Sequence, residues 1–202
     1  MKAPLIAICR HRLALDGEGV VTLVAFHGCP LSCRYCLTPH CREPEGLWRR
    51  MDARELLDEV MVDDLYFQAT GGGVTFGGGE PLLRSAVIAD FCRHCPPQWH
   101  IGIETSLAVT QRRLAEVAPY VHRFIVDVKD MDPDIYRRYT GCDNSRVTAN
   151  LGWLARNVDH SRVVIRLPRI PGYNTPADVA RSRRQLEDMG FTLFDCFDYL
   201  LP

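Results

Sequence analysis

Short apolar segments rich in β-branched residues alternate along this chain with segments of helical periodicity. The predicted strands cover residues 20–26, 74–76, 100–103, 124–128, 163–167 and 193–197. Strand–helix units of roughly 30 residues predict a parallel sheet with right-handed crossovers. We therefore expect an α/β fold, a partial (β/α)6 barrel of parallel strands that forms a single domain over residues 1–202.

Two of the intervening segments carry helix start signals. Asp52 and Glu55 have the spacing of a capping box, and an apolar face follows them as far as residue 61. Thr175, with Pro176 at the first helical position, begins the last predicted helix. Gly190 is expected to end that helix, because glycine readily adopts the left-handed conformation found after helix ends.

Polar and reactive residues follow the carboxyl ends of successive predicted strands. They are a cysteine loop at 29–36, a glycine turn at 77–81, Glu104 with Thr105, the segment 127–129, and Arg166. In α/β barrels, active sites assemble at this edge of the sheet. The placement of these residues therefore predicts one site at the carboxyl edge.

Composition narrows the function classes. The chain has 202 residues, of which 47% are hydrophobic and 24% charged, as in a compact globular domain. A net charge of −1 without a basic cluster argues against nucleic acid as a partner. No apolar run approaches the ~18 residues of a membrane span. Nine cysteines, an odd number without a signal peptide, favour a reducing cytoplasm over a secreted disulfide framework.

The cysteine loop indicates a metal or cluster site. Cys29, Cys33 and Cys36 are spaced so that their thiolates can face one point, which suits an iron–sulfur cluster or zinc. A cubane has four irons, so three cysteines leave one iron open, whereas a structural metal site is normally closed by a fourth ligand. The alternatives are a zinc site completed by His40 or Cys41, or a set of buried thiols.

Lysine is rare in this sequence, with Lys2 and Lys129 against twenty-two arginines. Lys129 comes two residues after Asp127 at the end of an apolar strand, so on an extended backbone the two side chains share one face. A compact ammonium group at this point is suited to bind a ligand carboxylate. The alternative is an ordinary lysine in a solvated loop.

Two further motifs have simpler readings. The glycine turn is not followed by Lys-Ser or Lys-Thr as in a P-loop, and its spacing does not match the dinucleotide fingerprint, so a plain tight turn is its alternative interpretation. Cys92 and Cys95 enclose His94 near a predicted helix end. We favour buried thiols there over half of a metal site, because free cysteine is among the most buried residue types.

An ordered set of motifs connects this chain to a known family. The set comprises residues 16–19, the cysteine loop with Tyr35, and the segments 71–81, 104–105, 127–129, 139–141, 166 and 171–174. It resembles the radical S-adenosylmethionine (SAM) superfamily and, within it, the activating enzymes of glycyl radical enzymes, such as pyruvate formate-lyase activase. The cysteine spacing indicates the superfamily, and the ordered set indicates the activating enzymes.

This resemblance implies cofactors and site residues. Cys29, Cys33 and Cys36 would hold one 4Fe-4S cluster, and the amino and carboxylate groups of SAM would chelate the fourth iron. The implied SAM contacts are Tyr35, Cys36, Leu37, Gly78, Gly79, Glu80, Thr105, Asp127 and Lys129. Tyr35 and Leu37 would line the adenine site, although an aromatic packed into the core is the alternative for Tyr35. Asp16 and Arg166 are assigned to the substrate.

The chain departs from the resembled family at several positions. Glu104, Thr105 and Asp127 match positions that bind a monovalent cation beside SAM, but relatives have Asp where this chain has Glu104. Gly77 stands where relatives often have a small hydroxyl residue. The segment 198–200 reads Asp-Tyr-Leu in place of Pro-Tyr-His, and a leucine cannot form a hydrogen bond. We therefore expect a more exposed SAM site that a partner protein completes.

The implied activity is that of a radical SAM activase. Such an enzyme cleaves SAM reductively to a 5′-deoxyadenosyl radical and abstracts hydrogen from a glycine of a partner glycyl radical enzyme. Flavodoxin or ferredoxin would supply the electron. The alternatives are a radical SAM enzyme acting on a small molecule or short peptide, and a zinc-stabilised domain without catalytic activity.

Overall fold

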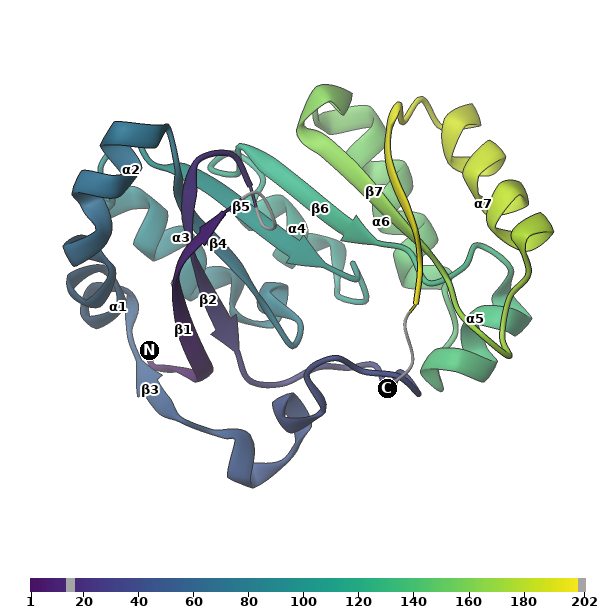
Figure 1. The fold of residues 1–202 in the computed structure, drawn as a ribbon, viewed down its shortest axis with the longest axis horizontal. Coiled ribbons are helices and arrows are strands. Elements are labelled where there is room, and N and C mark those ends of the chain that lie inside the picture. Colours follow the sequence, from purple (N-terminus) through teal and green to yellow (C-terminus); the bar gives the residue numbers. More distant parts are fainter. Residues whose placement is uncertain (14–16, 200–202) are drawn as a thin grey trace.

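The computed structural model describes residues 1–13 and 17–199, and its strands form one eight-stranded sheet (Figure 1). In sheet order the strands are β3 (Arg49–Met51), β1 (Ala3–Leu13), β2 (Val20–Phe26), β4 (Gly73–Gly78), β5 (His100–Thr105), β6 (Arg123–Asp127), β7 (Val163–Arg169) and β8 (Leu193–Asp198). The sequence-based assignments to Asp16 and Leu200 concern residues outside the described ranges.

The parallel part of the sheet contains the strands that the sequence predicts. From β2 to β8 the strands pair in parallel and follow chain order, apart from β3, which pairs with β1. The sheet is twisted and curved, with β3 and β8 at its two edges (Figure 1). The expected α/β fold with parallel strands is confirmed.

Strands β1 and β3 lie outside the sequence predictions. β1 runs antiparallel to both neighbours, with two register shifts against β2. Its Arg10 interrupts an apolar run yet remains in the strand, because its guanidinium group is 2.6 Å from Asp63 and 3.0 Å from Glu59. Ion pairing thus accommodates a charge that the sequence pattern treats as a break.

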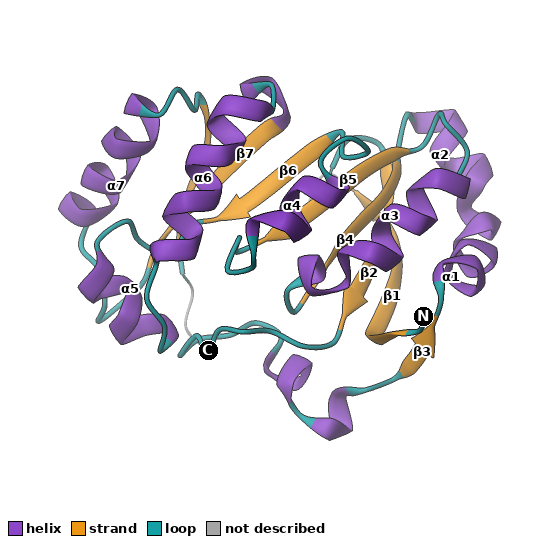
Figure 2. Ribbon diagram, turned by 180° about the vertical axis from the view of Figure 1, so that it is seen from behind, coloured by secondary structure: helices purple, strands orange, loops and turns teal. Residues whose placement is uncertain are grey.

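Helices connect the strands, and α3, α4 and α6 lie across one face of the sheet (Figure 2). The α-helices are α1 (Ala53–Val60), α2 (Asp64–Thr70), α3 (Ser85–His94), α4 (Gln111–Val117), α5 (Pro133–Thr140), α6 (Ser145–Asn157) and α7 (Pro176–Asp188). Short 3-10 helices are η1 (Pro39–Arg42), η2 (Pro44–Gly46), η3 (Met61–Asp63), η4 (Pro81–Arg84) and η5 (His160–Arg162).

Both predicted helix starts are confirmed. The Asp52 side chain accepts hydrogen bonds from backbone N–H groups in the first turn of α1, and the Glu55 carboxylate accepts from the Asp52 N–H in return. Thr175 and Asp178 form the same reciprocal pair at the start of α7. Gly190, with φ of +97°, follows the end of α7 and allows the chain to turn toward β8.

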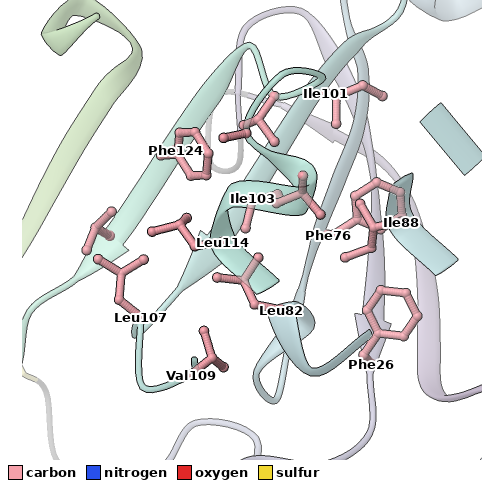
Figure 3. Packing of buried hydrophobic residues seen from close by; sticks show 14 of the residues in the cluster. Phe26, Phe76, Leu82, Ile88, Ile101, Ile103, Leu107, Val109, Leu114 and Phe124 are labelled. Atoms are coloured by element: carbon pink, nitrogen blue, oxygen red, sulfur yellow. The ribbon is translucent and has the colours of Figure 1, made fainter. Parts of the chain in front are cut away.

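The main core lies between the sheet and the helices that cover it. Phe76, Ile103 and Phe124 from three successive strands meet Leu82 and Leu114 from the helical layer, and all are fully buried (Figure 3). Because side chains alternate across a strand, the neighbouring positions face the opposite side of the sheet. That side is therefore free to carry polar groups.

Candidate active site

A cavity of about 190 Å³ opens at the carboxyl ends of the parallel strands. It is lined by residues from the cysteine loop and from the ends of β4 to β7: Cys29, Leu31, Cys33, Cys36, Leu37, Thr38, Gly78, Gly79, Glu104, Thr105, Ser106, Ile125, Asp127, Lys129, Arg166 and Tyr199. The structure thus brings together three cysteines, two glycines and the acidic and basic residues singled out from the sequence.

The cysteine loop is fixed to the glycine turn through backbone hydrogen bonds. The Gly79 N–H donates to the Phe26 carbonyl at 2.9 Å, and the Glu80 N–H donates to the Gly28 carbonyl at 2.8 Å. These bonds extend the β2–β4 pairing past the ends of both strands. The turn therefore sets the point from which the cysteine loop departs.

The other side of the cysteine loop is fixed to the end of α5. The Ser32 N–H donates to the Thr140 carbonyl at 2.8 Å, and the Arg34 N–H donates to the Tyr139 carbonyl at 3.1 Å. These carbonyls belong to the last turn of the helix, where no intrahelical partner exists. The loop is thus held between the sheet and α5.

Glycine is required at two positions of the turn for packing. Gly78 has φ of +90°, and a Cβ there would lie 2.9 Å from the Cβ of Ala25. A Cβ on Gly79 would lie 2.3 Å from the carbonyl oxygen of Gly28. The family resemblance implies that Gly78 and Gly79 contact SAM. In the structure, both glycines lie against the end of β2 and the start of the cysteine loop.

The thiols of the loop differ in their electrostatic environment. The Cys41 thiol, buried at the end of the loop, lowers the pKa of Cys36 to about 6 and also lowers the pKa of Cys29. Burial instead raises the pKa of Cys33 to about 12. Two of the three thiols are therefore predisposed to ionise, and ionised thiolates are the form that binds metals.

The three thiols of the loop lie around one space. Cys29, Cys33 and Cys36 all line the same cavity. Among the residues that the structure describes, no set of three or more Cys, His, Asp or Glu side chains is arranged to hold a single metal ion.

Lys129 is a buried cavity residue with 8% of its surface exposed, so the solvated-loop alternative is wrong. Burial lowers the pKa of Lys129, but the charges of Asp127 and Cys33 outweigh this effect, and the net pKa is raised. The ammonium group lies 2.5 Å from Asp127 Oδ2. The other carboxylate oxygen, Oδ1, is buried and has no hydrogen-bond partner within the described residues. A ligand is the natural partner for such an atom.

The family resemblance implies that Glu80 contacts SAM, and in the structure its carboxylate bonds to neighbouring protein groups. Its side chain is 1% exposed and accepts from Thr105 Oγ1 at 2.7 Å, from Ser106 Oγ at 2.6 Å and from the backbone N–H groups of Ser106 and Leu82. Burial raises its pKa. The carboxylate caps η4 and ties the glycine turn to the end of β5, so it is not among the residues that line the cavity.

Two residues beside the third cysteine take different positions. Leu37 lines the cavity and is 81% exposed. Tyr35 instead packs against Tyr139 and Tyr173, with ring centroids 6.2 Å and 5.8 Å away. The structure therefore places the half-buried Tyr35 in an aromatic cluster outside the cavity lining.

The two departures at Gly77 and Glu104 are physically linked. A Cβ on Gly77 would lie 3.2 Å from Glu104 Oε2, so the glutamate occupies space that a side chain at 77 would take. Glu104 also pairs with Arg166 at 3.0 Å, and Arg166 lies 3.4 Å from Asp195. The predicted substrate residue Arg166 is thus positioned in the cavity by acidic side chains from β5 and β8.

Several site residues carry no signal in the sequence. From the sequence, Cys41 is only an alternative zinc ligand, and its position beside Cys29 and Cys36 depends on the folding of η1. Tyr136 on α5 is buried, and α5 is bonded to the cysteine loop through the Ser32 N–H. About a hundred residues separate the helix from the loop in sequence, so the sequence does not reveal that they pack together.

Residues 23–181 match the family model of the radical SAM superfamily, and the chain belongs to this family. Membership implies a 4Fe-4S cluster and SAM, and the cavity offers a suitable donor set of three thiols on one loop. None of the described helices is long and apolar enough to cross a membrane.

The curated relatives extend the family resemblance to particular enzymes. The chain is 32% identical over 162 residues to the (2S)-3-sulfopropanediol dehydratase activating enzyme of Klebsiella oxytoca, covering 78% of this chain and 49% of that protein. It is 35% identical over 128 residues to the pyruvate formate-lyase-activating enzyme of Clostridium pasteurianum, covering 63% and 53%. The resemblance to activating enzymes is confirmed, and the chain spans about half the length of these relatives.

Solved structures support the fold. SuiB of Streptococcus suis, bound to SAM, superposes with a TM-score of 0.67 over 89% of this chain and 42% of SuiB, at 13% sequence identity. At this identity the similarity concerns the fold alone.

Proposed function

We propose that this chain is a radical SAM activase that abstracts a hydrogen atom from a glycine of a partner glycyl radical enzyme. The observation that carries the proposal is the cavity in which Cys29, Cys33 and Cys36 meet Asp127 and Lys129. The similarity to enzymes named for activating a dehydratase and a formate-lyase supports the choice of substrate class. In this proposal, residues 1–202 act as one radical SAM domain.

Different side chains of the cavity would bind the cluster, SAM and the partner protein. Cys29, Cys33 and Cys36 would hold the cluster, and Lys129 would bind the carboxylate of SAM. When bound, the cluster and SAM supply one-electron cleavage of the sulfonium S–C5′ bond, which gives methionine and a 5′-deoxyadenosyl radical that takes the hydrogen atom. Arg166, held by Glu104, would contact the partner's glycine segment.

The proposal includes the setting and the remaining partners. A flavodoxin or ferredoxin in a reducing cytoplasm would supply the electron, and neither nucleic acid nor a membrane takes part. The orphan Oδ1 of Asp127, beside Thr105 in the cavity, supports a cationic neighbour, either a monovalent cation or the ammonium group of SAM. Glu104 already pairs with Arg166 at 3.0 Å through Oε1.

The test is anaerobic reconstitution followed by hydrogen tracing. The protein is loaded with iron and sulfide, reduced with dithionite, and given SAM with pyruvate formate-lyase labelled with α-deuterated glycine. We expect deuterium in 5′-deoxyadenosine and a glycyl radical signal by electron paramagnetic resonance. (2S)-3-sulfopropanediol dehydratase is tested as a second partner, because the similar activating enzymes are named for different partner enzymes.

Two outcomes would contradict the proposal. Cleavage of SAM without label transfer from any tested partner would favour a radical SAM enzyme with a small-molecule or peptide substrate. Zinc in place of about four irons per chain would refute cluster chemistry altogether. The Cys33→Ala protein, handled in parallel, shows the level of product that arises without a bound cluster.

A further inference from the structure

One face of α5 carries an unexplained polar group. Tyr136 is 1% exposed, and its hydroxyl is buried without any hydrogen-bond partner among residues 1–13 and 17–199. The ring packs in the main hydrophobic core. A phenylalanine would fill the same space without burying a hydroxyl group, so the oxygen adds only a desolvation cost unless a partner arrives.

The surroundings of the Tyr136 hydroxyl point to the cysteine loop. Cys29, Cys33 and Cys142 pack against the core cluster that contains Tyr136. The pKa of Tyr136 is raised by burial and then by the charges of Cys33, Cys142, Glu80 and Cys29. The helix that carries Tyr136 is bonded to the loop through the Ser32 N–H. The position of the phenol relative to the cysteines is therefore fixed by the fold and does not depend on a flexible side chain.

Most of these neighbours already have other partners. The oxygens of Glu80 accept four hydrogen bonds, all from residues at the ends of β4 and β5. The Cys142 thiol donates to the Pro30 carbonyl at 3.5 Å, so it stays a neutral thiol, whose sulfur is a weak acceptor. The sulfur atoms of Cys33 and Cys29 become strong acceptors once they are ionised in a cluster.

We propose that the Tyr136 hydroxyl donates a hydrogen bond to the Cys33 thiolate when the cluster is bound. This bond raises the reduction potential of the cluster. The proposal rests on the proposed radical SAM chemistry. Reduction adds negative charge to the cluster, and a donor on a ligand sulfur stabilises the reduced form more than the oxidised form. Cys33 lies between Ser32 and Arg34, whose N–H groups donate to carbonyls at the end of α5, so it is the loop cysteine held against the helix that carries Tyr136.

The experiment measures the midpoint potential of the reconstituted full chain. Tyr136→Phe removes only the hydroxyl group. We expect the ratio of reduced to oxidised cluster at a fixed solution potential to fall about fivefold, the effect of one net hydrogen bond. For a one-electron couple this corresponds to a midpoint about 40 mV lower. The reduced fraction is read by electron paramagnetic resonance in a dye-mediated titration.

A second substitution tests the sign of the effect. Replacing Tyr136 by 3-fluorotyrosine makes the phenol a stronger donor with nearly the same shape. We expect its midpoint to shift upward, opposite to that of Tyr136→Phe. A change in packing alone would not produce opposite shifts at one position. Tyr173→Phe is the matched control, because Tyr173 belongs to the neighbouring aromatic cluster and is expected to leave the midpoint unchanged.

The outcomes separate this inference from the proposed function. Iron-loaded Tyr136→Phe protein with a wild-type midpoint would overturn the hydrogen bond while leaving the activase proposal intact. Equal downward shifts for the phenylalanine and fluorotyrosine variants would also overturn it, since they would indicate packing. Failure of the wild-type chain to bind a cluster would overturn the proposed function itself.

Discussion

Two carboxylates at the carboxyl edge of the sheet have opposite environments. Glu80 is fully buried and accepts four hydrogen bonds from residues that follow β4 and β5. Asp127, at the end of β6, faces the cavity, pairs with Lys129 through one oxygen and leaves the other buried without a partner in the described chain. The first is satisfied by the fold, and the second needs something that the fold does not provide.

The same contrast extends beyond the two carboxylates. Away from the cavity, Asp63 is buried but is paired with Arg10 and accepts from Thr22 at 2.7 Å. On α5, the hydroxyls of Tyr136 and Tyr139 are buried without partners within the described residues, as is Arg84 Nε. Of these atoms and Asp127 Oδ1, the aspartate oxygen belongs to a residue that lines the cavity, where a ligand supplies the missing bond.

The largest effect is expected from removing a thiol on the unsatisfied side. Cys33→Ala should abolish cluster binding and SAM cleavage, because two thiolates do not retain a cubane at an exchangeable site. The measurement is iron and sulfide content after anaerobic reconstitution. Cys92→Ala is the control, because Cys92 lies on α3 and is not among the residues that line the cavity. Loss of iron from the Cys92 variant would contradict the single-cluster assignment.

The pKa of Cys36 can be tested in iron-free protein. With a pKa of about 6 in place of an ordinary 9.0, the thiolate-to-thiol ratio should be roughly a thousandfold higher at any pH well below both values. Alkylation of the Cys36 peptide in iron-free protein should therefore rise with pH and level off above about 6. In Cys41→Ala protein the midpoint should move toward 9, because the largest cause of the shift is gone. An unchanged midpoint would show that Cys41 is not that cause.

The satisfied side is tested through folding stability. Glu80→Gln keeps the size of the side chain but places an amide group against donors from Thr105 and Ser106. We expect the free energy of unfolding to fall by about 3 kcal/mol, as for a buried charged group that loses its partners. Tyr136→Phe deletes an orphan hydroxyl and should leave the iron-free protein equally stable or more stable. Urea unfolding followed by circular dichroism measures the free energy of unfolding of both variants. Equal losses of stability would show that the Glu80 carboxylate is no better satisfied than the Tyr136 hydroxyl.

The smallest of these effects concerns the ligand-facing ammonium group. Lys129→Met should preserve the cluster but weaken SAM binding by about 1.5–3 kcal/mol, the range for hydrogen bonds to charged groups. Anaerobic titration of the reconstituted protein with SAM measures the affinity. Lys2→Met, which changes the other, exposed lysine, should leave the affinity unchanged. If both variants bind SAM like the wild type, Lys129 serves only its ion pair with Asp127.

Much of the fold follows from local patterns, and the exceptions have physical causes. The parallel strands are predictable because their buried faces form apolar β-branched runs. β1 contains Pro4 and Arg10, and the distant Glu59 and Asp63 explain why a charge fits in that strand. β3 spans three residues with two exposed arginines, too short and polar to give any periodic signal.

The site divides in a similar way. The cysteine spacing, the glycine turn and the pair at 127 and 129 are local features, and the structure places them around one cavity. The side-chain direction of Glu80 could not be read from its motif, because it depends on donors that follow β5. The roles of Cys41 and Tyr136 depend on η1 and α5 docking against the loop, which spacing alone does not reveal.

The backbone pairing that continues past β2 and β4 has a practical consequence for mutagenesis. The register runs from Val21 opposite Gly73 to Phe26 opposite Gly78, and the next bonds belong to the cysteine loop. A slip of one residue anywhere in this ladder would turn every side chain to the wrong face and displace the first cysteine. If the reconstituted protein holds an iron–sulfur cluster, it should be brown, and that colour should fade in β2 or β4 variants that shift the strand register without changing a cysteine.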